Sequence, residues 1–199
     1  MRREPYPWAP PGHDNAAMER ALQAEQQDEA ITVLRPGMIY GPLSAGREWT
    51  IVRLVRAGVH RIELSDGGAQ FFARVAVERV GRAVVAAAER DSDPFVPVNV
   101  VDPYGWTYAR LVREIGRFLD WEWEPVFVPW GEAWHPFQTH TPYVCSDARL
   151  RELLGVHEPD PREALAETVR WLMEHGAEHY PAIDEPAVAT ARGPEKRTS

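Results

Sequence analysis

The sequence predicts an α/β fold, and three observations point to it. Continuous apolar runs bounded by turn residues, at 31–34 and 96–101, are typical of strands in a parallel sheet that is covered on both faces. Amphipathic stretches long enough for helices lie between such runs, and several begin at a capping residue. The chain has 199 residues, 44% of them hydrophobic, which is enough to bury a core. We therefore expect a globular chain in which helices and strands alternate.

The expected elements follow the chain in order. Asp14 caps a helix that runs to about residue 28, and residues 31–34 form the first strand. The others are a helix at 48–57, a strand at 61–64, a turn at 66–68, an extended segment from 71, a helix at 78–89, a strand at 96–101, a helix at 107–119, a strand at 126–128, and two helices that open at Ser146 and Pro161 and end near Gly155 and Gly176. The helix at 78–89 carries Val80, Ala83, Val84 and Ala87 on one side. Residues 1–12 are an expected extended lead-in, and residues 177–199 an expected disordered tail.

Charge and composition exclude several classes of function. The net charge is -8 and no stripe of Lys or Arg is present, so nucleic acid is not an expected partner. Cys145 is the only cysteine, which excludes an internal disulfide. No apolar run approaches the roughly 20 residues of a membrane span, and residues 1–12 lack the apolar stretch of a signal peptide. A cytoplasmic location is expected, without membrane contact.

The stretch 35–42, RPGMIYGP, resembles the RPxxxYGP signature of the extended short-chain dehydrogenases/reductases, the NAD-dependent epimerase/dehydratase family. Further stretches similar to that family follow in its usual order: DGG at 66–68, VAVERV at 75–80, PVNV at 97–100 with DP at 102–103, and SDARLRELLG at 146–155. The resemblance spans 13 to about 174, and the expected domain is 13–176. It implies the C-terminal half of such an enzyme, a partial Rossmann-like parallel sheet with a small α+β substrate-binding subdomain.

The family's cofactor and catalytic motifs are missing from the chain. No Gly-rich dinucleotide turn occurs, and the aligned positions of the family's Tyr-x-x-x-Lys pair hold Pro11 and Asn15. The only lysine is Lys196. No catalytic residue is therefore assigned, and the chain alone is expected to bind no cofactor. NAD(P) is expected only if a nucleotide-binding half completes the fold.

The resemblance also implies candidate binding residues. Pro36, Met38 and Tyr40 belong to the loop that in the family borders the cofactor, here expected to be vestigial. Tyr40 has an alternative role, in which it packs the turn and keeps a structural hydroxyl bond. Arg74 lies in the segment that faces substrate in the family and is either an anion contact or an ordinary surface arginine. The family's arginine after the DGG turn is absent, which argues against a nucleotide-sugar substrate.

An aromatic-rich stretch supplies the other candidates for substrate binding, Trp130 and His135. It either lines a ligand pocket or belongs to the core, and its members are Trp121, Trp123, Phe127, Trp130, Trp134 and Phe137. Glu132, His135 and His140 match no metal-ligand spacing, so no metal is expected.

Two functions remain open. In the first, the chain is a non-catalytic module that binds a small molecule or another subunit. Loss of the flanking strands leaves the edge of the strand at 31–34 unpaired, which favours a homodimer or capture of a partner chain. In the alternative, the chain is the C-terminal part of an active NAD(P)-dependent epimerase, dehydratase or reductase whose nucleotide-binding half lies upstream or on another chain.

Overall fold

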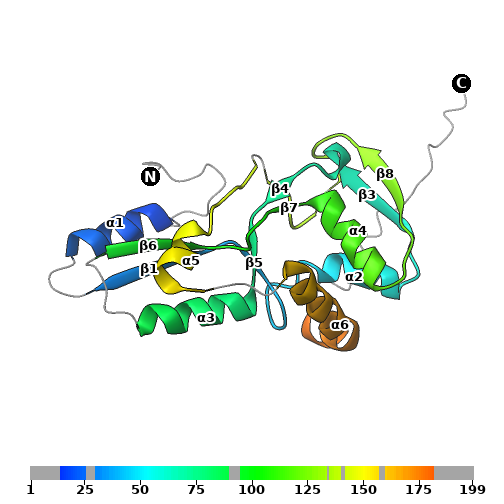
Figure 1. Cartoon of the computed structure of the whole chain (residues 1–199). Helices are drawn as coiled ribbons and strands as arrows, with labels where there is room; N and C mark the ends of the chain where they lie inside the picture. Colours follow the sequence, from blue (N-terminus) through cyan, green and yellow to red (C-terminus); the bar gives the residue numbers. More distant parts are fainter. Residues whose placement is uncertain are drawn as a thin grey trace, which may run out of the picture.

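The computed structural model describes residues 14–25, 30–89, 95–133, 135–139, 142–156 and 160–181. It has the α/β architecture that the sequence predicts, as a partial Rossmann-like fold with short parallel strand pairs. Figure 1 shows two parts, one around β1 and β6 and the other around α2, α4 and α6. No helix in the described ranges is both long and apolar enough to cross a membrane.

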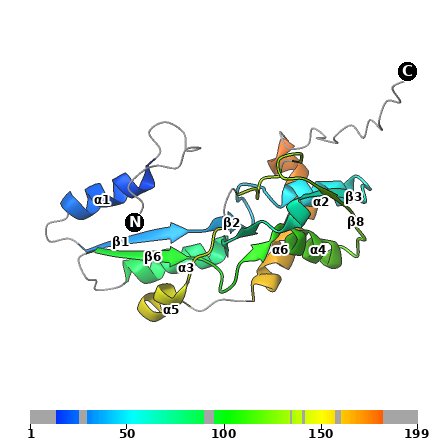
Figure 2. The same cartoon turned by 90° about the horizontal axis from the view of Figure 1, so that it is seen from above.

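The first part is built on a parallel strand pair. β1 (Ile31–Pro36) pairs with β6 (Phe95–Val100) over the whole length of both strands. α1 (Asn15–Glu25) and α3 (Val77–Ala88) lie on opposite sides of this pair in Figure 1, and α5 (Ala148–Leu154) lies next to β6 in Figure 2. The core here is small and aliphatic, with Val75, Ala83, Val96, Val98, Val100, Leu150 and Val156 buried.

The chain crosses between the two parts more than once, and the first crossing follows β1. After β1 the chain passes through Gly37 into β2 (Met38–Tyr40), which pairs in parallel with β5 (Arg74–Ala76). The Gly37 N–H donates to the Val100 carbonyl at 3.0 Å, whereas the Met38 N–H donates to the Ala73 carbonyl at 3.0 Å. The strand therefore changes partner at Gly37.

The second part has a larger core that is rich in aromatic side chains. β3 (Arg61–Ser65) pairs in parallel with β8 (Glu124–Val128), and β4 (Phe71–Phe72) pairs antiparallel with β7 (Trp106–Thr107). α2 (Trp49–Arg56), α4 (Tyr108–Phe118) and α6 (Pro161–His179) pack against one another, and the turn at 66–68 is the short 3₁₀ helix η1 (Asp66–Gly68). The largest fully buried side chains of this core are Trp49, Trp106, Tyr40, Phe72 and Phe137.

Local capping residues predicted where the helices start. The Asp14 carboxylate accepts a hydrogen bond from the Ala17 N–H at 2.9 Å, and the Thr107 hydroxyl accepts one from the Arg110 N–H at 3.2 Å. Ser146 accepts from the Ala148 N–H at 3.2 Å, just ahead of α5, and Gly155 ends α5 in the left-handed conformation.

The last helix runs past its expected end. α6 continues through Gly176 to His179, so residues 177–179 are helical and do not belong to a tail. Gly176 is needed for packing, because a Cβ there would lie 2.3 Å from Cε3 of Trp49. The expected lead-in at 1–12 and residues 182–199 lie outside the described residues.

The first part is less buried than the sequence predicts. All residues of β1 except Pro36 are only half-buried, and Val84 on α3 is 52% exposed. Within the described residues, β1 has a strand neighbour on one edge only, which explains the incomplete burial.

Candidate functional site

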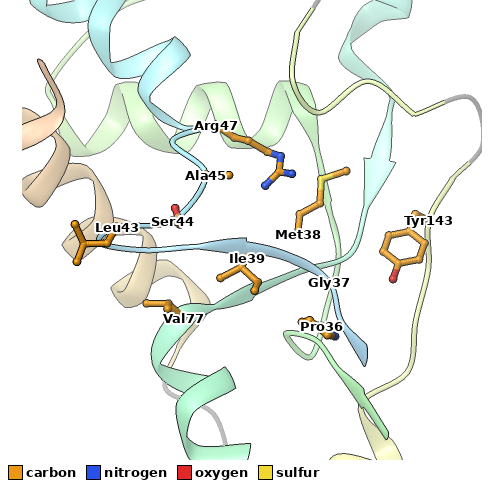
Figure 3. A pocket seen from close by; sticks show the side chains of 10 residues that line it. All are labelled: Pro36, Gly37, Met38, Ile39, Leu43, Ser44, Ala45, Arg47, Val77 and Tyr143. Carbon is orange, nitrogen blue, oxygen red and sulfur yellow. The ribbon is translucent and has the colours of Figure 1, made fainter. Parts of the chain in front are cut away.

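A pocket opens where β2 ends, and it has a volume of about 590 Å³ (Figure 3). Its lining residues are Pro36, Gly37, Met38, Ile39, Leu43, Ser44, Ala45, Arg47, Val77 and Tyr143. They come from the junction of β1 and β2, the loop between β2 and α2, the start of α3 and the segment before α5. In open α/β sheets ligands bind beyond the carboxyl ends of the strands, and this pocket lies at that position. Two of the residues assigned to the cofactor loop, Pro36 and Met38, form part of its wall.

The loop after β2 has an unusual backbone. Gly41 has a φ of 129°, and a Cβ at this position would lie 2.5 Å from Cγ1 of Val77. Leu43 adopts a φ of 60° although it is not a glycine, and its side chain is 72% exposed at the pocket. Such a conformation costs about 1–3 kcal/mol and is found most often at functional sites.

Arg47 is the only charged residue among the described residues that line the pocket. Its side chain extends over β2 toward Met38, and Tyr143 lies on the opposite side (Figure 3). Within the described part of the chain, the Arg47 guanidinium makes no hydrogen bond and no ion pair. Neither Arg47 nor Tyr143 is predicted as a site residue from the sequence, although the position of Arg47 in the loop after the YGP motif is an available signal.

Tyr40 lies behind the pocket and does not line it. Its side chain is 1% exposed, and its hydroxyl donates to Oδ2 of Asp102 at 2.9 Å. Burial raises the pKa of Tyr40, and the negative charge of Asp102 raises it further. Burial also raises the pKa of Asp102. This geometry matches the structural role for the Tyr40 hydroxyl, because a buried phenol with a raised pKa is a poor proton donor to a ligand.

Arg74 is buried, which fits neither of its expected roles. The side chain is 1% exposed, and Nη2 donates to Oε1 of Glu48 at 2.7 Å. Its guanidinium carbon lies 3.8 Å from the ring centroid of Tyr40. An anion contact and a surface position both require an accessible guanidinium. Arg74 instead ties β5 to the start of α2 and so fixes the loop that carries Arg47.

Trp130 and His135 lie apart from the pocket. Trp130 follows β8 and is 42% exposed. His135 is 4% exposed and stacks on Tyr108 with 3.8 Å between the ring centroids. Burial lowers the pKa of His135 to about 4, and neither ring nitrogen has a hydrogen-bond partner among the described residues. His135 therefore occupies a core position as a neutral ring.

The aromatic stretch does not form one cluster. Phe137 stacks on Phe72 in the core, Trp121 stacks on His60, and Phe127 is 67% exposed. Trp134 and His140 lie outside the described residues. Within the described ranges, no three His, Cys, Asp or Glu side chains come together as a metal site.

Arg79, in the VAVERV stretch at 75–80, has a structural role. It is fully buried, and Nη2 donates to Oδ2 of Asp147 at 2.9 Å. This ion pair joins α3 to the start of α5. Asn15, at the position of the family's lysine, begins α1.

Comparison with known proteins shows the fold. No family model matches the chain, and no curated protein matches it. UDP-glucose 4-epimerase from Thermotoga maritima, solved with UDP-glucose, has 23% identity and a TM-score of 0.63 over 80% of this chain and 52% of its own. UDP-glucuronic acid 4-epimerase from Bacillus cereus, solved with UDP-glucuronic acid and NAD, has 12% identity and a TM-score of 0.66 over 80% and 51%. dTDP-glucose 4,6-dehydratase from Streptomyces venezuelae, solved with NAD, has 17% identity and a TM-score of 0.66 over 83% and 51%.

These similarities confirm the expected resemblance to NAD-dependent epimerases and dehydratases at the level of fold. The chain spans about half the length of the solved structures that it matches.

Proposed function

We propose that this chain is the substrate-side module of an NAD(P)-dependent epimerase/dehydratase-type protein and is not catalytic by itself. In this proposal it presents a ligand pocket, and the edge of β1 that has no strand neighbour among the described residues pairs with a nucleotide-binding half or, when the chain is alone, with a second copy. The similarity to about half of several NAD-bound structures supports such a division of the fold.

The observation that carries the proposal is the outer edge of β1, which has no strand neighbour among the described residues. Pro36 is the register partner of Val100, and the Gly37 N–H donates to the Val100 carbonyl. In a parallel pair this pattern directs alternate residues toward the partner, so the backbone groups of Thr32 and Leu34 point to the other edge. Strands of a parallel sheet normally have strand neighbours on their edges and helices on both faces. A two-stranded sheet by itself is only marginally stable.

Exposed apolar side chains lie on α1, the helix attached to β1. On α1, Met18 is 56% exposed and Leu22, one turn later, is 38% exposed. The buried residue of α1 is Glu19, whose carboxylate receives hydrogen bonds from Arg35 on β1. α1 is thus attached to β1 by an ion pair and leaves apolar side chains uncovered. A further strand with its own helices would cover them.

The chemistry of the site supports a non-catalytic role. Tyr40 is turned away from the pocket toward Asp102, and Arg74 is paired with Glu48 in the core. The sequence places no lysine near the motif, and Asn15 cannot lower the pKa of a neighbouring tyrosine.

A second function is favoured by the position of the pocket. Pro36 and Met38, which the resemblance assigns to the cofactor side, line a pocket at the carboxyl end of the sheet. This arrangement suits the C-terminal part of an active NAD(P)-dependent epimerase, dehydratase or reductase. We rank this candidate second because Pro11 and Asn15 occupy the aligned positions of the family's Tyr-x-x-x-Lys pair.

The test combines cofactor binding with assembly. Titration of the purified chain with NADH and NADPH, followed by energy transfer from tryptophan to nicotinamide, is expected to show no saturable binding. Tight binding would overturn the proposal.

Assembly is measured separately by sedimentation velocity at high micromolar concentration, where the free β1 edge is expected to pair with a second copy. Thr32→Pro removes an outward N–H and should abolish this pairing, whereas Thr32→Val keeps that N–H and should not. A monomeric wild-type chain, or equal association by both variants, would contradict the role of the edge.

A further inference from the structure

We infer that the pocket at the end of β2 binds the phosphate or carboxylate group of a small ligand through Arg47. The inference shares with the proposed function only the location of the ligand site. It names the ligand class and the residue that selects it.

The first argument is the state of the Arg47 side chain. Arg47 is half-buried, and its guanidinium lies in the pocket with no hydrogen bond or ion pair to any described residue. Arginine is the residue that best matches the planar geometry of carboxylate and phosphate, since its fork can donate two parallel hydrogen bonds. A half-buried guanidinium without a partner is therefore well suited to an anion from solution.

The second argument is that the neighbouring acid is already occupied. Glu48 follows Arg47 directly, but its carboxylate is 2% exposed and accepts from Arg74 at 2.7 Å. The Arg47 carbonyl accepts from the Thr50 N–H at 3.2 Å and from the Thr50 hydroxyl at 2.7 Å. The backbone of Arg47 is thus held at the start of α2, while the acid next to it is directed into the core.

The third argument is the charge of the pocket wall. None of the ten described residues that line the pocket is acidic, although the whole chain has a net charge of -8. A local positive charge in an acidic protein concentrates anions at that site and disfavours cations. Ser44 contributes a hydroxyl group to the lining, and Tyr143 contributes a phenol on the side opposite Arg47 (Figure 3).

The remaining wall indicates the rest of the ligand. Met38, Ile39, Leu43 and Val77 give the pocket an apolar surface beside Arg47. A volume of about 590 Å³ is within the range of small-molecule sites. The expected ligand therefore has an anionic group for Arg47 and an apolar or ring-shaped body for the adjacent wall.

The test uses 1-naphthyl phosphate and 1-naphthoate as probes, with 1-naphthol as the uncharged control, in calorimetric titrations of the full chain. Both anions are expected to bind more tightly than 1-naphthol, and the stronger of the two identifies phosphate or carboxylate as the preferred group. Arg47→Gln should weaken anion binding at least about tenfold, because it removes a charge-assisted interaction. Arg47→Lys should retain part of the affinity.

Arg113→Gln is the matched control, because Arg113 is an exposed arginine on α4 outside the pocket. It should leave the affinity unchanged. The inference is overturned if neither anion binds, if Arg47→Gln binds as tightly as the wild type, or if Arg113→Gln causes an equal loss. None of these results bears on the association measured with the Thr32 variants, so the two proposals can fail separately.

Discussion

The part built around α2, α4 and α6 closes its own core, whereas the part built around β1 and β6 leaves apolar side chains on its helices. In the former, Trp49, Trp106 and Phe72 are each at most 1% exposed. In the latter, the buried side chains are mainly valines, and Met18 and Val84 remain more than half exposed. Both parts contain a two-stranded parallel pair, so the strands themselves do not make the difference. It comes from the large aromatic side chains, which fill the core of the part around α2, α4 and α6.

The largest expected effect comes from removing a core side chain in either part. Trp49→Ala should lower the free energy of unfolding by about 3–5 kcal/mol, and Leu150→Ala by about 2 kcal/mol, because the cavity left by tryptophan is larger. Urea denaturation measures both values.

Hydrogen exchange sharpens this comparison. Leu150→Ala should speed amide exchange in β1, β6 and α3 while α4 and α6 stay protected, because the small core opens locally. If α4 and α6 exchange faster by the same factor, the two parts unfold as one unit and the contrast between them is wrong.

A similar effect is expected where the two parts meet. Arg74→Met leaves the Glu48 carboxylate buried without a partner, which should cost about 3–5 kcal/mol of unfolding free energy. The double variant Arg74→Met/Glu48→Gln should recover part of this loss, because the buried charge is gone. Arg113→Met, at an exposed position of α4, is the control. Urea unfolding of all three variants measures the change in the free energy of unfolding.

The pH dependence tests the aromatic core. Burial lowers the folded-state pKa of His135 to about 4, below the ordinary value of 6.5, so the unfolded chain takes up the proton first. The contribution of neutral His135 to the free energy of unfolding is therefore complete above pH 6.5. It decreases by up to about 1.4 kcal/mol per pH unit as the pH falls toward 4. His135→Phe keeps a ring against Tyr108 and should remove this slope, as measured by denaturation between pH 4 and 7. An unchanged slope would show that His135 is not the group responsible.

The smallest effect on stability is expected on the exposed face of α1. Met18→Gln and Leu22→Gln should change the free energy of unfolding by no more than about 0.5 kcal/mol, because both side chains are already exposed. Association at high concentration should nevertheless weaken, because the proposed pairing of β1 would cover the exposed side chains of α1. Val144→Gln, at a site 70% exposed outside α1, is the control and should leave sedimentation unchanged.

The sequence by itself determined the features that depend only on residues close together in the chain. The caps at Asp14 and Thr107, the apolar strands and the left-handed end of α5 at Gly155 follow from local patterns, and the structure confirms each of them. The RPxxxYGP motif also located the loop whose residues Pro36 and Met38 line the pocket. These features could be predicted because their causes lie within a few residues of each position.

The tertiary structure decided the roles of the polar side chains. Tyr40 bonds to Asp102 across 62 positions, and Arg74 pairs with Glu48 across 26, so neither partner was visible from its own segment. Because Arg74 pairs with Glu48, the acid that follows Arg47, the Arg47 guanidinium has no ion pair among the described residues. Likewise, a glycine is needed at 176 inside α6 because the indole of Trp49 occupies the space that a side chain would take. Pairing and burial depend on which segments meet in space, and local sequence patterns do not contain that information.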